Sequence, residues 1–267
     1  MFQHFLIAWR SGLRSRSFRA IFILGLLAMG GAYLAAQFSG RQPATVALDV
    51  GLSAIRAIGL LLVLFWGHEF VGKEIERRTL FVSLTYPLPR GAFLAGRYFG
   101  LLALLVPALA VLGLLLTGTV HLAGHDYLQA TPISLGPAFW LTLAYIALDL
   151  TVIAAFGILV SALSTTPFLP LAMGLAFALA ARSLGPALDY VLANLDAPHE
   201  ANQTLLPILD TARWLMPDLS RLDIRPLTLY GHWPSPDVLS FGALMAISYS
   251  GLMLALSVWA FKRRQFN

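Results

Sequence analysis

The sequence predicts an all-α integral membrane protein with six transmembrane helices, and three observations lead to that fold class. Apolar residues make up 58% of the 267 residues and charged residues only 12%, whereas a soluble domain carries about 25% charge. The mean hydropathy is +0.75. The apolar residues lie in runs of about 20, the length that crosses hydrocarbon as a helix. Together with the absence of cysteine, these features exclude a soluble enzyme, a disordered chain and a disulfide scaffold.

Six apolar runs are the expected spans of a single transmembrane domain covering residues 1–267. Helix is expected because every backbone N–H in lipid must be bonded within its own segment. The runs cover residues 20–37, 44–66, 93–118, 138–160, 168–184 and 238–261. A long outer loop, residues 185–237, holds two pieces of amphipathic pattern, 187–195 and 205–216, which predict short outer helices between the fifth and sixth spans.

The basic residues predict the orientation of the chain. Twelve Lys and Arg residues lie before the first span, between the second and third spans, or after the sixth. The opposite side holds Arg41 and four arginines in or beside the acidic outer loop, Arg182 among them. The positive-inside rule therefore places both termini in the cytoplasm. The net charge of +5 follows from this topology, so no nucleic-acid partner is expected.

Residues 1–19 predict an amphipathic helix on the inner leaflet. Trp9 and Arg10 would anchor it, and Phe2, Phe5 and Leu13 recur at helical spacing on its apolar side. The alternative interpretation is a frayed start to the first span.

The connection between the second and third spans, residues 67–92, carries the most informative pattern. It begins as a charged helix and then shows an apolar face. A short cytoplasmic helix of this kind is suited to docking on another protein. The charged positions are Glu74, Glu76, Arg77 and Arg78, and the apolar positions are Leu80, Phe81 and Leu84.

This pattern resembles the ABC-2 class of ATP-binding-cassette transporter permeases. In that class a segment of the form E-x-E-R-x-T-L follows the second helix, and a P-x-x-R turn and a G-[RK]-Y/F-x-G start to the next span come after it. The layout agrees over nearly the whole chain, and the subset nearest in appearance is the one encoded beside copper-enzyme maturation genes. The matching residues are Glu74, Glu76, Arg77, Thr79, Leu80, Pro87, Arg90, Gly96, Arg97, Tyr98 and Gly100.

The resemblance implies a permease subunit of an exporter that has no ATPase activity of its own. Two permease copies would pair in the bilayer, and two cytoplasmic ATPase subunits, which would bind the ATP and Mg²⁺, would dock beneath them. No cofactor is expected in this chain itself, and the cargo is not identified. The expected docking residues are Glu74, Glu76, Arg77, Arg78, Thr79, Leu80, Phe81 and Leu84.

Two other functions stay open at this point: a membrane-embedded hydrolase or transferase, and a membrane anchor that recruits an extracytoplasmic partner through the outer loop. Residues 67–74 fit seven positions of a phosphate-binding loop, but Glu74 replaces the Ser or Thr that holds Mg²⁺. His121 and His125 share a helical face beside Asp126, which is an incomplete metal site. No metal site is therefore predicted.

Two ionisable residues lie deep within the expected spans. Arg56 falls near the middle of the second span and Asp149 near the middle of the fourth. At 1.5 Å per residue, both lie about 15–18 Å from the outer end. An isolated charge at this depth is unfavourable, so the sequence predicts an intramembrane polar pair. Its role is either a static salt bridge between helices or contact with cargo.

Overall fold

The computed structural model describes residues 9, 16–72, 90–125, 133–164, 166, 168–193 and 216–263. The regular structure within these ranges is helical, without a strand. Three elements are short: the π-helix η1 (His68–Gly72), the 3₁₀-helix η2 (Leu219–Leu222) and α10 (Arg225–Tyr230). The long helices are α2 (Arg16–Gln37), α3 (Pro43–Gly67), α6 (Arg90–Gly124), α7 (Pro137–Leu163), α8 (Leu169–Ala193) and α11 (Pro236–Arg263).

Five helices of the described ranges are long and apolar enough to cross a membrane: Pro43–Phe70, Gly91–Gly124, Pro137–Leu163, Leu169–Tyr190 and Pro236–Arg263. The apolar part of α2, Phe22–Gln37, is shorter. The prediction of an all-helical protein with several membrane helices is therefore confirmed. The arrangement of six spans, with α2 as the first, stays a prediction.

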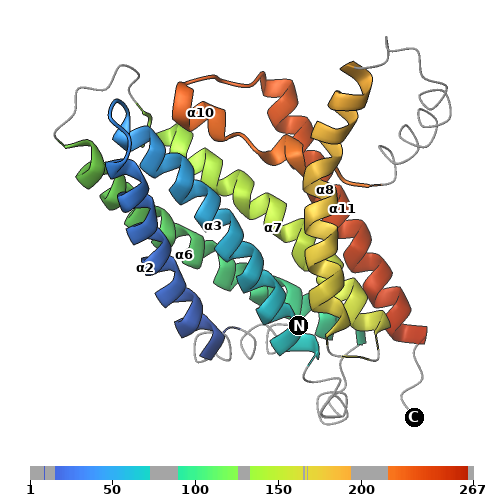
Figure 1. Ribbon diagram of the computed structural model, residues 1–267. Coiled ribbons are helices and arrows are strands. Elements are labelled where there is room, and N and C mark those ends of the chain that lie inside the picture. The colour runs from blue at the N-terminus through green and yellow to red at the C-terminus, as the bar shows by residue number, and fades with distance from the viewer. Residues whose placement is uncertain are drawn as a thin grey trace.

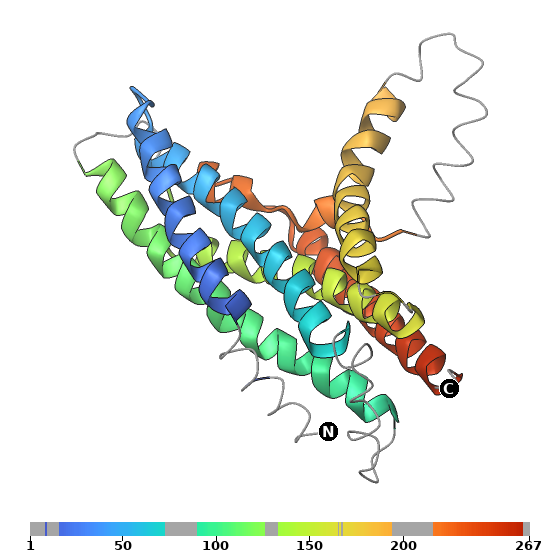
Figure 2. The same cartoon turned by 60° about the horizontal axis from the view of Figure 1, so that its bottom comes forward.

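The helices run alternately up and down through one bundle (Figure 1). The start of α2, the junction of α3 with η1, the start of α6 and the end of α11 lie at one end of the bundle. α10 and the start of α11 lie at the other end. α3 and α7 form the centre, with α2 and α6 beside α3 and with α11 along α7. Figure 2 shows α8 diverging from α2, α3 and α6 toward its C-terminal end.

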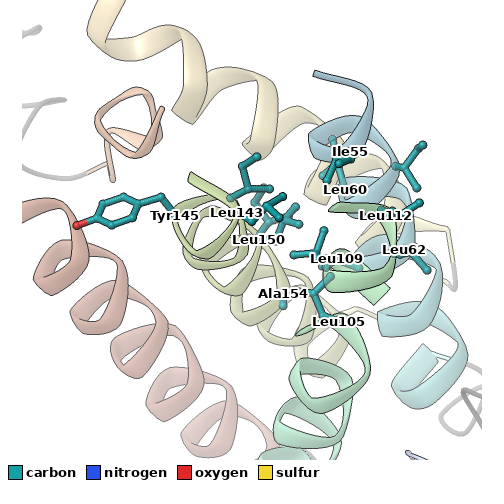
Figure 3. Close-up of a cluster of buried hydrophobic side chains, with 14 of the residues drawn as sticks. Ile55, Leu60, Leu62, Leu105, Leu109, Leu112, Leu143, Tyr145, Leu150 and Ala154 are labelled. Carbon is teal, nitrogen blue, oxygen red and sulfur yellow. The ribbon is translucent and has the colours of Figure 1, made fainter. Parts of the chain in front are cut away.

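The core is a layer of leucine-rich side chains between α3, α6 and α7 (Figure 3). Ile55 and Leu62 of α3 belong to this layer together with Leu105 and Leu109 of α6, and all four side chains are at most 3% exposed. Gly59 permits close approach of α3 and α7, because a side chain there would collide with Leu150 of α7. Small residues at such contacts are typical of membrane helices, where close packing stabilises association.

α8 differs from the sequence-based expectation. The predicted fifth span ends at residue 184, before Gly185 and Pro186, but α8 continues as one helix to Ala193. Proline lacks an N–H and usually breaks a helix, yet membrane helices accommodate it by local adjustment of the freed carbonyls. Residues 187–193 therefore extend α8, and the prediction of a separate outer helix at 187–195 is wrong over this range.

Several predicted elements lie wholly or mostly outside the described residues. The expected interfacial helix, 1–19, is represented by Trp9, which packs against the buried core, and by residues 16–19, which begin α2. Of residues 67–92, the predicted coupling segment between the second and third spans, the structure describes η1 and the start of α6. Of the predicted helix 205–216, it describes only Met216. The short helices described between α8 and α11 are η2 and α10.

Candidate functional site

The two groups of predicted site residues have different outcomes. The expected docking residues Glu74, Glu76, Arg77, Arg78, Thr79, Leu80, Phe81 and Leu84 lie outside the described residues. Arg56 and Asp149 are described, and the structure brings them together: Arg56 Nε donates to Asp149 Oδ2 at 3.0 Å. The two groups meet in the middle of α3 and α7.

Asp149 is fully buried and accepts hydrogen bonds from two arginines. Arg182 of α8 donates to Asp149 Oδ2 from Nη2 at 2.6 Å and from Nε at 3.2 Å. The Asp149 side chain is 0% exposed, while those of Arg56 and Arg182 are 13% and 19% exposed. A buried carboxylate requires such partners, because its desolvation is costly and is offset only by close pairing and good hydrogen bonds. Asp149 thus joins α3, α7 and α8.

Arg56 also bonds to a segment that folds back from the α8–α11 connection. We name residues 216–231 the cap segment. Arg56 Nη1 donates to Asp223 Oδ2 at 2.9 Å, and Nη2 donates to the Leu219 carbonyl at 3.4 Å. The guanidinium therefore uses all three of its nitrogens, in the planar fork arrangement that arginine supplies and lysine does not.

Arg225 continues the charged contacts toward the surface. Its Nε and Nη2 donate to the two oxygens of Asp223 at 2.8 and 2.7 Å. Its Nη1 donates to Ser53 Oγ at 2.6 Å and to Asp49 Oδ1 at 3.3 Å, both on α3. Burial raises the pKa of Asp223, but the hydrogen bonds and charge of Arg225, with the charge of Arg56, outweigh burial and hold that pKa below its usual value. Asp223 therefore stays ionised at neutral pH.

We name the resulting set the ion network. Positive and negative charges alternate along it, and its exposure rises from fully buried Asp149 to half-exposed Asp49. Three arginines balance three aspartates, so the set is neutral as a whole. Its members, in order of contact, are Arg182, Asp149, Arg56, Asp223, Arg225 and Asp49.

Apolar and neutral polar contacts seat the cap segment on the bundle beside the ion network. Leu219, Leu222 and Leu227 are at most 1% exposed. Thr228 Oγ1 lies 2.6 Å from Thr142 Oγ1 of α7 and donates to the Ala138 carbonyl. On α8, a side chain at position 185 would collide with Ser220. Because Gly185 has no side chain, α8 can approach η2 closely. The cap segment is thus an integral part of the packed bundle, in contact with α3, α7 and α8.

Sequence reasoning finds Arg56 and Asp149 and misses the other four members of the ion network, Asp49 among them. It places Arg182 beside the outer loop, because the fifth span is expected to end just after it. Asp223 and Arg225 belong to a polar, proline-containing stretch without hydrophobic periodicity, which gives no signal that the chain folds back between helices. The predicted pair gives Asp149 one arginine partner, whereas the structure gives it two. Counting depth along the expected fifth span does not find the second, because it puts Arg182 near the outer end.

The chemistry of the ion network is that of a structural connector. Its arginines and aspartates are paired with one another, and none of its six members is a hydroxyl or imidazole nucleophile. Within the described residues, no group of three or more His, Asp or Glu side chains is arranged to hold a metal ion. The network connects α3, α7, α8 and the cap segment, elements that are otherwise joined mainly by apolar packing.

We expect Asp149→Leu to destabilise the protein more than Arg56→Leu or Arg182→Leu. Loss of Asp149 strands two arginines, while loss of one arginine leaves Asp149 with the other. Removal of one partner from a buried pair typically costs about 3–5 kcal/mol. The midpoint of thermal unfolding, followed by tryptophan fluorescence in detergent, measures the order. Arg41→Leu is the control, because Arg41 is an exposed residue between α2 and α3.

The double replacement Arg56→Leu with Asp149→Leu should lower the stability by less than the sum of the two single replacements. Each single replacement leaves the other residue as an unpaired charge, and the double replacement removes that charge too. Strictly additive losses would show that the two residues do not interact. Equal losses for Asp149→Leu and Arg41→Leu would contradict the buried role of Asp149.

Comparison with known proteins identifies the family. The model of the ABC-2 family transporter proteins matches residues 6–266. A protein of Stutzerimonas stutzeri, named "Probable ABC transporter permease protein NosY", is 39% identical over 107 residues, which are 38% of this chain and 37% of that protein. A protein of the same name in Pseudomonas aeruginosa PAO1 is 34% identical over 151 residues, 50% of this chain and 54% of that protein. The chain thus spans about half, or less, of the length of these curated relatives. The match over nearly its whole length confirms the resemblance found in the sequence: the chain belongs to the ABC-2 family of transporter proteins.

Proposed function

We propose that this chain is the membrane-spanning permease subunit of an ATP-driven ABC exporter. It would form half of the translocation path and receive a separate ATPase subunit, which binds ATP and Mg²⁺, on its cytoplasmic side. The family match over residues 6–266 is the observation that carries this proposal. The bundle of long apolar helices supports it, because a permease must cross the bilayer several times.

We propose that both termini and the coupling segment face the cytoplasm of a bacterial inner membrane. In support, the start of α2, the end of α11 and the two flanks of residues 73–89 lie at the same end of the bundle (Figure 1). Arg19, Arg97 and Lys262 belong to that end. An excess of basic residues on one side is the usual mark of the cytoplasmic face.

The flanks of the coupling segment are suited to transmit force into the bundle. Phe70 of η1 stacks on Trp66 of α3 with ring centroids 6.4 Å apart. On the other flank, Phe93 of α6 stacks on Phe261 of α11 at 6.1 Å, and the guanidinium of Arg97 lies 5.4 Å from the centre of the Phe93 ring. All four aromatic side chains are at most 2% exposed. A displacement of the segment would therefore be passed to α3, α6 and α11 through rigid packed contacts.

Replacement of Leu80 and Phe81 by Asp should release the ATPase. Buried apolar anchors supply most of the affinity of an interface, and the surrounding charges mainly set orientation. Co-purification of a tagged permease with its co-expressed ATPase subunit measures the loss. Phe38→Asp is the matched control, since Phe38 is 91% exposed at the opposite end of the bundle. Stoichiometric co-purification of the Leu80→Asp/Phe81→Asp variant would refute this docking site, and the anchor function would then be favoured.

We propose that two copies of the permease pair about a two-fold axis normal to the membrane, with one ATPase beneath each. One chain of this size cannot enclose a path between two halves, and two-fold pairing is the commonest closed symmetry. The native mass of the complex extracted in detergent should correspond to two permeases and two ATPases. A mass with one permease per two ATPases would be incompatible with a permease dimer.

A further inference from the structure

A pocket of about 520 Å³ opens beside the first turns of α11, at the end of the bundle where α10 lies. Its lining consists of Arg221 from η2 and of Asp237, Val238 and Phe241 from α11. Tyr230 and Trp233, just before α11, are 55% and 65% exposed. Exposed aromatic residues beside the end of an apolar helix mark the depth of lipid headgroups. The pocket is therefore at the boundary between headgroups and hydrocarbon.

Arg221, the cation of the pocket, forms its ion pair with Asp218 through only one of its three side-chain nitrogens. Arg221 donates from Nε to Asp218 Oδ2 at 3.1 Å, and its guanidinium lies 5.3 Å from the centre of the Phe241 ring. Among the described residues, no group accepts a hydrogen bond from its two terminal nitrogens. A guanidinium with two neighbouring free N–H₂ groups matches the geometry of a phosphate.

The negative charge in the pocket belongs to Asp237, in the first turn of α11. Within the described part of the chain, no ion pair joins its exposed carboxylate to Arg221 across the pocket or to another cation. Arg221, which is paired with Asp218, and Asp237 therefore line one cavity without forming an ion pair with each other. This arrangement is complementary to a ligand that carries a phosphate and an ammonium group a few ångströms apart.

An apolar stripe runs from the pocket along α11 toward the middle of the bilayer. Val238, Phe241 and Leu244 recur at a spacing of three residues, which places them on one face of the helix. They are 51%, 55% and 64% exposed. This stripe continues from the charged rim in the direction that an acyl chain takes from its headgroup.

We propose that this pocket binds a zwitterionic phospholipid with a primary ammonium group, such as phosphatidylethanolamine. Arg221 contacts the phosphate, Asp237 contacts the ammonium, and an acyl chain lies along the stripe of Val238, Phe241 and Leu244. An anionic phospholipid is disfavoured, because Asp218 and Asp237 together outweigh the charge of Arg221. The binding is a property of the permease chain alone and does not depend on the docking of an ATPase.

Native mass spectrometry of the detergent-purified full-length protein tests the proposal by titration with three lipids of equal chain length: phosphatidylethanolamine, phosphatidylcholine and phosphatidylglycerol. The wild type should bind phosphatidylethanolamine most tightly. Arg221→Gln should weaken that binding about tenfold, the factor that corresponds to 1.4 kcal/mol. Asp237→Asn should remove the preference for phosphatidylethanolamine over phosphatidylcholine. Arg41→Gln and Asp189→Asn, which change exposed residues at the same end of the bundle, are the controls.

Two results would overturn the proposal. Equal affinity for the three lipids in the wild type and the variants would mean that only bulk lipid contacts this face. Tightest binding of phosphatidylglycerol would assign the pocket to an anionic lipid instead. Asp237 is exposed and its replacement leaves the core untouched, so the Asp237→Asn variant remains a valid test even if Arg221→Gln does not fold.

Discussion

The buried carboxylate of Asp149 is the constraint on which the arrangement of the bundle depends. In the middle of a membrane protein a lone charge is strongly unfavourable, and Asp149 has no exposed surface. Its two arginine partners must therefore stay within hydrogen-bonding distance, and they come from helices on either side, α3 and α8. Because α8 packs mainly on α7 and η2 and diverges from the other helices (Figure 2), these ion pairs add a polar link between α8 and the centre of the bundle.

The same constraint extends to the cap segment. Arg56 cannot lose its proton and already shares Asp149 with Arg182, so it needs a second anion, which Asp223 supplies. Asp223 in turn holds Arg225 against α3. The cap segment is therefore attached to the helix that leads directly into η1 and the coupling segment. Under the proposed function, a displacement of the coupling segment that reaches α3 would therefore reach the cap segment as well.

The fold could be predicted from the sequence because membrane helices are long apolar runs. Depth along a helix can be counted, and for this reason Arg56 and Asp149 could be paired from their positions in the chain alone. Arg182 could not be included, because Gly185 and Pro186 indicate a helix end that the bundle overrides. Asp223 and Arg225 could not be placed, since a polar stretch folded back by charge pairing has no periodic pattern. The Arg221–Asp237 pocket depends on side-chain positions that no spacing rule supplies.

Charge pairing of Asp223 with Arg56 and Arg225 holds the cap segment against the bundle. Hydrogen–deuterium exchange of the detergent-purified protein, comparing the wild type with Asp223→Asn, measures this contribution. If the pairing is what holds the segment, peptides covering residues 219–230 exchange slowly in the wild type and markedly faster in the variant, because loss of the carboxylate charge weakens its hold on Arg56 and Arg225. Peptides of α7 outside the contact should exchange equally in both proteins. Identical slow exchange of residues 219–230 in the two proteins would show that apolar packing alone holds the cap segment, and would contradict the account.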